Sequence, residues 1–173
     1  MSLIARLFGA PPPRDALDPL YRAIVAAGRD PAWYRQGGVA DTIDGRFDMI
    51  AALTALVLLR LESGDAGRDP SVLLTELFIA DMDSSLRQIG IGDYVVGKQV
   101  GRMMGALGGR LSALREAGDQ AALAAVVERN IFRGAAPSSE ALAFVSLRLD
   151  SFRTKLAAMP LAELLAGALP SHD

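Results

Sequence analysis

The sequence lacks cysteine altogether, and its only histidine is His172. Without cysteine there is no disulfide framework, no thiol nucleophile and no thiolate metal site. A single histidine argues against a histidine general base, a Ser-His-Asp triad and a His-rich zinc site. Any enzymatic chemistry would therefore rest on carboxylates, Arg, Lys or Tyr.

Long apolar runs and an excess of one charge are also missing. The net charge is −2, which lacks the basic excess of proteins that bind nucleic acid by neutralising phosphates. The longest apolar run, residues 49–59, would cover roughly 16 Å as a helix, whereas a bilayer core measures roughly 30 Å. We find no secretory signal of the usual type. We expect a cytoplasmic protein with no specific nucleic-acid partner.

The first residues read MSLIARLFGAPPPR. We treat 1–14 as a flexible or amphipathic segment, and 15–173 as one helical domain. Residues 1–8 are amphipathic enough for peripheral contact with the inner face of the inner membrane. A mobile tail that ends at the three prolines is the alternative.

What the chain does contain is apolar residues at helical spacing. They make up 51% of 173 residues, enough for one sizeable core. No stretch alternates with the period of a strand. The sequence therefore predicts an all-α, single-domain bundle of about six or seven helices. The expected helices are 19–27, 43–62, 70–89, 93–117, 120–132, 137–158 and 160–169, with a short turn or helix at 31–35.

Two signals refine this helical pattern. Asp18-Pro19, Asp30-Pro31 and Asp69-Pro70 are typical of helix starts, with aspartate as the cap and proline at the first position. The run 43–62 is apolar nearly all round in its middle, which predicts a helix at the centre of the bundle.

An acidic cluster offers one route to chemistry. Asp81 and Asp83 flank Met82, and Asp44 and Asp48 lie in an earlier helix. Acidic clusters on helices can bind divalent metals, so a metal-dependent helical enzyme is one alternative function. However, the spacing is D-x-D with no second matching motif, and Asp83 can pair with Arg87 one turn later. We therefore expect a non-enzymatic protein without cofactor or metal.

Glycines interrupt the helix expected at 93–117, where each costs about 1 kcal/mol relative to alanine. Such a cost needs an offset, and removal of Cβ atoms lets another backbone approach closely. We expect a helix of this chain to pack there, with a partner's helix as the alternative. Gly45, early in the second long helix, suggests a close neighbour for the same reason. The glycines of the ridge are Gly97, Gly101, Gly105, Gly108 and Gly109.

Two strings carry a resemblance to a known family. DTIDGRFDM (residues 41–49) and FIADMDSSLRQIGIGDYVVGK (residues 78–98) resemble the ubiquinol-cytochrome c chaperone family of alphaproteobacteria and mitochondria, over roughly residues 20–117. The resemblance implies an assembly factor for respiratory complex III that binds newly made cytochrome b and acts with a small co-chaperone. Mitochondrial members associate with the ribosome, but a net charge of −2 gives no strong attraction for rRNA, so we do not carry ribosome docking over.

A chaperone for apolar helices needs an apolar surface and polar rim groups that set the register. Our candidate residues come from the strings that match the family. The alternatives are an ordinary core with helix caps, and a generic helical adaptor with another client. The expected apolar floor is Phe47, Met82, Leu86 and Tyr94. The expected rim is Asp44, Arg46, Asp48, Asp81, Asp83, Arg87, Asp93 and Lys98.

Overall fold

The computed structural model describes residues 15–88, 90 and 92–171, without the side chains of Asp93 and Tyr94. The segment 1–14, with its predicted membrane contact, lies outside this part. The described residues form helices and no strand, which confirms the predicted all-α fold. The helices are α2 (Asp18–Gly28), α3 (Pro31–Arg35), α4 (Ile43–Leu61), α5 (Arg68–Gln88), α6 (Asp93–Glu116), α7 (Gln120–Asn130), α8 (Ser139–Ala158) and α9 (Leu161–Leu165), with a 3-10 turn, η1 (Asp65–Gly67), before α5.

The helix caps agree with the sequence only in part. Asp30 caps α3 as predicted, because its carboxylate accepts the Ala32 backbone N–H at 2.8 Å. Asp18 does not cap α2, which begins one residue earlier than expected, with Leu17 at the cap position. Asp18 instead pairs with Arg22 on the helix surface. An Asp-Pro pair therefore marks the region of a helix start here without fixing the capping residue.

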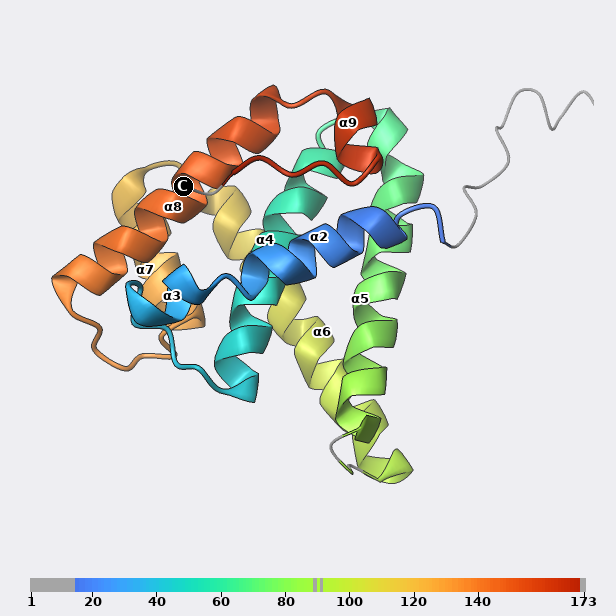
Figure 1. Ribbon diagram of the computed structural model, residues 1–173, viewed down its shortest axis with the longest axis horizontal. Helices are drawn as coiled ribbons and strands as arrows, with labels where there is room; N and C mark the ends of the chain where they lie inside the picture. Colours follow the sequence, from blue (N-terminus) through green and yellow to red (C-terminus); the bar gives the residue numbers. More distant parts are fainter. Residues whose placement is uncertain (1–14, 89, 91, 172–173) are drawn as a thin grey trace, which may run out of the picture.

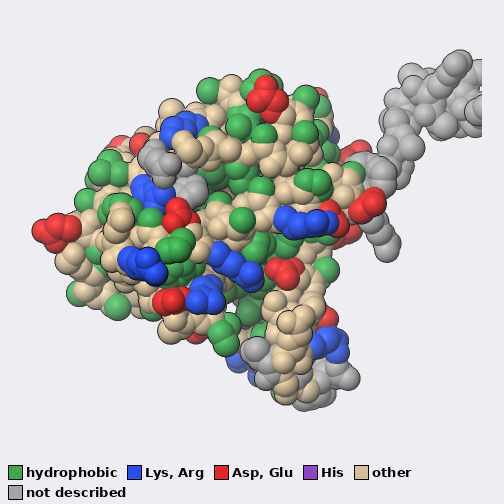
Figure 2. All heavy atoms as spheres, in the orientation of Figure 1, with side chains coloured by type: hydrophobic (Ala, Val, Ile, Leu, Met, Phe, Trp, Pro, Cys, Tyr) green, Lys and Arg blue, Asp and Glu red, His purple; other side chains and the backbone are tan. Residues whose placement is uncertain are grey.

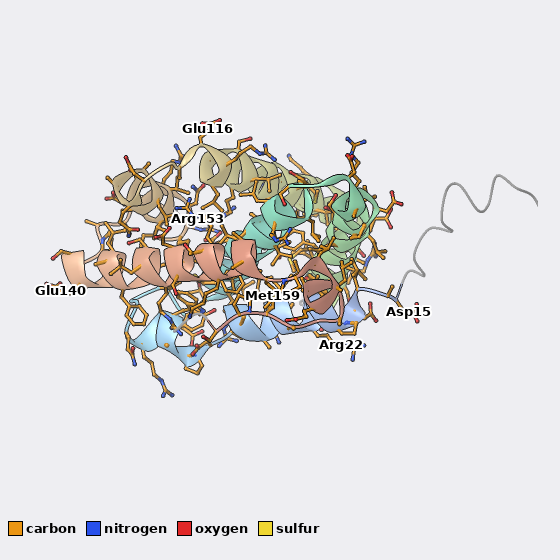
Figure 3. All side chains as sticks on the ribbon, turned by 90° about the horizontal axis from the view of Figure 1, so that it is seen from above. Asp15, Arg22, Glu116, Glu140, Arg153 and Met159 are labelled. Carbon is orange, nitrogen blue, oxygen red and sulfur yellow. The ribbon has the colours of Figure 1, made fainter. Side chains whose placement is uncertain are left out.

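Helix α4 lies at the centre of the molecule, as its apolar sequence predicts. Every residue from Phe47 to Leu58 is buried, because α2 packs on one side of α4 and α6 on the other (Figure 3). The buried side chains of the helices form one cluster around α4. None of the described helices is long and apolar enough to cross a bilayer.

Helices α5 and α6 form an antiparallel hairpin whose far end projects away from the other helices (Figure 1). Leu86 of α5 and Val96 of α6 are buried in this projecting part, at 4% and 1% exposure. The hairpin therefore keeps an apolar seam of its own beyond the central core. It also leaves a recess between its inner side and the start of α4.

The glycines of α6 do not behave as the sequence suggested. A Cβ atom added at each of the five would meet nothing within 4 Å among the described residues, and all five lie on the exposed side of the helix. The expectation of a closely packed helix from this chain is therefore wrong. Gly45 does follow its prediction, since a Cβ there would lie 2.0 Å from the Ala40 carbonyl oxygen.

Candidate functional site

An apolar cavity of about 230 Å³ opens between the start of α4 and the α5–α6 hairpin. Its walls include Phe47 and Ile50 of α4, Met82 and Leu86 of α5, and Met103 of α6. Phe47, Met82 and Leu86 are the three floor residues predicted from the sequence whose side chains the structure describes. They come together because α4 and α5 pack side by side, and the Phe47 and Phe78 ring centroids lie 6.0 Å apart.

Charged residues and one exposed apolar residue edge this cavity. Arg46 and Asp81, both predicted for the rim, line it together with Arg29 of the α2 end. Arg46 pairs with Asp41 at 2.7 Å, and this ion pair is about half exposed. Ile43 also lines the cavity, although 64% of it is exposed. Figure 2 shows this face, with charges of both signs below α2 and a hollow beside the hairpin.

Asp81 is fixed by a tyrosine from another helix. The Tyr21 hydroxyl of α2 donates a hydrogen bond to the Asp81 carboxylate at 2.8 Å. Burial, followed by this hydrogen bond and the negative charge of Asp81, raises the pKa of Tyr21 far above its usual value, while the nearby Arg29 opposes the shift. The tyrosine therefore stays a protonated hydrogen-bond donor to Asp81.

A second, shallower trough lies where α2 meets α5. Its α2 side carries Tyr21, Val25 and Arg29, and its α5 side carries Leu77 and Asp81. These residues recur every three or four positions, so each helix presents one face to the trough. Arg29 and Asp81 line both hollows. The trough therefore continues into the cavity at these two residues.

Asp48 does not lie on the rim. It is fully buried, and its carboxylate accepts hydrogen bonds from Arg110 of α6 and, at 2.6 Å, from Arg133 Nε after α7. Arg110 is 5% exposed, also donates to the Asn130 carbonyl at 2.8 Å, and lies 5.6 Å above the Phe47 ring. The arrangement ties α4, α6 and the end of α7 together directly behind the cavity floor.

Arg133 completes this network from the surface. It donates to Asp44 at 3.0 Å as well as to Asp48. Its backbone has a φ of 54°, in the left-handed region that residues other than glycine seldom adopt. Burial raises the pKa of Asp48 and lowers that of Arg110, and the Arg133 hydrogen bond opposes the rise at Asp48. The two arginines thus offset part of the cost of burying the Asp48 carboxylate.

Four further residues predicted for the rim line neither hollow: Asp44, Asp83, Arg87 and Lys98. Asp44 is exposed and bonded to Arg133, whereas Asp83 and Arg87 form an i,i+4 ion pair at 2.7 Å on α5. Lys98 is exposed on α6. The side chains of Asp93 and Tyr94 lie outside the described part.

Six lining residues were missed from the sequence: Arg29, Ile43, Ile50, Ser85, Gln88 and Met103. Arg29 directly follows α2 and Met103 belongs to α6. Both lie outside the two strings that resemble the family, so the neighbouring sequence does not indicate that either residue lines a cavity. Ile43 could have been found, because it is an apolar residue within the family-like string DTIDGRFDM.

The acidic residues do not form the shared chamber that a metal enzyme would need. Asp44 and Asp48 meet at Arg133, Asp81 is bonded to Tyr21, and Asp83 is bonded to Arg87. In the described part of the chain, no group of three His, Asp or Glu side chains is placed to hold a metal ion.

The fold and this site define an all-helical protein with an apolar cavity edged by charges, a type of site at which proteins hold a segment of a partner. The family model for the ubiquinol-cytochrome C chaperone matches residues 35–170. The crystal structure of the Cbp3 homolog from Brucella abortus is similar at 30% sequence identity, with a TM-score of 0.75, and the match covers 96% of this chain and 93% of that one. No curated protein matches the chain. The chain therefore belongs to the ubiquinol-cytochrome c chaperone family.

Proposed function

We propose that this chaperone binds newly made cytochrome b and assists the assembly of respiratory complex III, acting at the inner face of the inner membrane without catalysis. Family membership carries the chaperone role. The observation that supports a bound client segment is the cavity between α4 and the hairpin, with its apolar floor and charged edge.

The size of the cavity suits part of a polypeptide. An apolar cavity of about 150 Å³ is enough to hold benzene, so about 230 Å³ accommodates one large apolar side chain and some of its neighbours. Binding sites for drug-sized ligands start at about 300 Å³. Apolar client helices bury their side chains in such a recess instead of aggregating in water.

The first test is deletion of the gene. We expect lower cytochrome b absorbance and less assembled complex III in membranes. Unchanged complex III in the deletion strain would overturn the proposed function.

A point substitution tests whether the cavity is the client site. Ile43→Glu places a charge on its edge at a residue that is 64% exposed, so the fold should tolerate it. Val72→Glu is the matched control, because Val72 is 60% exposed near the start of α5 and lines neither hollow. We expect newly made cytochrome b to co-purify less with Ile43→Glu only. Equal recovery with both variants would exclude this cavity as the site.

A further inference from the structure

The trough between α2 and α5 begins next to the point where residues 1–14 join the helical body. Asp18 lines the trough three residues after Asp15, which is exposed at the same end of α2 (Figure 3). From Asp18 the trough follows α2 to Arg29, where it meets the cavity. The 11 residues of α2 cover about 16 Å. A segment that turns back along α2 therefore reaches the junction within that distance.

The trough is lined by small and apolar side chains that the described residues leave partly uncovered. Val25 and Leu77 are half-buried, and Ala26 and Ala80 are exposed. The hollow measures about 750 Å³, within the range of about 300–1,000 Å³ that holds a drug-sized ligand. The junction carries one arginine beside one aspartate. Because these opposite charges balance, apolar contacts decide what lies in the trough.

The segment that precedes Asp15 has the length and the side chains to fill this hollow. Residues 9–14 read GAPPPR, a proline-rich stretch that spans about 19 Å when extended. This length is enough to carry residues 1–8 back along α2. Four apolar residues of that stretch would share one face of a helix. They are Leu3, Ile4, Leu7 and Phe8.

We propose that residues 1–8 lie along the trough and cover its junction with the cavity until a client displaces them. This deepens the proposed function, on which it rests, by naming what occupies the site before the client arrives. The tether of residues 9–14 holds the segment at about millimolar effective concentration, so weak apolar contacts with Val25 and Leu77 keep the site covered. Only a client that buries more apolar surface than the segment then gains access.

Disulfide trapping in the full chain tests this placement, because the natural sequence has no cysteine. The trough pair combines Ala5→Cys, beside the apolar face, with Ser84→Cys, at an exposed residue of the trough. The control pair combines Ala5→Cys with Val72→Cys, since Val72 is exposed on the same helix, about 18 Å from Ser84, and lines neither hollow. We expect the trough pair to close about tenfold faster in oxidised glutathione, because docking raises the local thiol concentration.

Two aspartates on the apolar face give the discriminating variant. Leu7→Asp/Phe8→Asp, added to the trough pair, should slow its closure to the rate of the control pair. The same two changes in the natural chain should increase the recovery of newly made cytochrome b, because the client loses its competitor. Ser2→Asp/Gly9→Asp is the matched control, since it adds the same charge off the apolar face, and it should keep the fast closure.

Equal closure of the two pairs would overturn the inference and leave residues 1–8 for the membrane contact expected from their sequence. Fast closure that survives Leu7→Asp/Phe8→Asp would overturn it as well. Disulfides that join two chains, seen as dimers on a non-reducing gel, would assign the trough to a second copy instead. Fast closure together with normal complex III after gene deletion would remove only the proposed client. Equal closure together with a loss of complex III would remove only the covering segment.

Discussion

The buried ion pair of Asp48 and Arg110 lies directly behind the cavity floor and should contribute to the stability of the fold. In Asp48→Asn, Arg110 would stay buried at 5% exposure without its carboxylate. Removal of one member of a buried ion pair costs about 3–5 kcal/mol, because the other charge is left uncompensated. We expect a loss of this size in the free energy of unfolding, measured by urea denaturation.

Two further variants compare the loss of a half-exposed charge with the removal of both buried charges. Arg133→Ala should cost only about 1 kcal/mol, since the Arg133 side chain is 48% exposed and Asp48 would keep Arg110. The double variant Asp48→Leu/Arg110→Met removes both buried charges, and it should come within about 1 kcal/mol of the wild type. If the double variant loses as much free energy of unfolding as Asp48→Leu and Arg110→Met lose in sum, the two buried charges do not compensate each other.

Three other changes have defined outcomes. Gly101→Ala and Gly105→Ala should each stabilise the protein by about 0.5–1 kcal/mol, because an added Cβ meets open space in the described structure; a lower melting temperature would contradict this. Gly67→Ala should destabilise it by about 1–3 kcal/mol, because a Cβ there lies 1.9 Å from the Leu61 carbonyl oxygen; denaturant titration measures this loss, and unchanged stability would argue against the close approach. Tyr21→Phe should cost about 1 kcal/mol in the same titration by removing the bond to Asp81, and no loss would mean that water replaces the hydroxyl.

The helices could be predicted from the sequence because their signals are local. The apolar run of α4 and the stripes of α5 and α8 repeat at helical spacing, and the apolar side chains of these helices form the core. The position of Asp48 could not be predicted, because its partners lie 62 and 85 residues away in the chain. Asp48 lies in the second turn of α4, and nothing in the neighbouring sequence distinguishes a buried aspartate there from an exposed one.

The cavity was only partly predictable for a related reason. Phe47, Met82 and Leu86 were found because they lie in strings that resemble the family. Arg29 and Met103 line the same cavity from helices outside those strings, and only the packing of four helices brings them together. The glycines of α6 were misread because a cost in helix propensity does not require close packing as its offset.

The recess has its two walls on different parts of the molecule, one on the central helix α4 and one on the projecting hairpin. Arg110 of α6 is bonded to Asp48 of α4 directly behind the floor of the recess. The spacing between the two walls therefore depends on the same buried ion pair that stabilises the core.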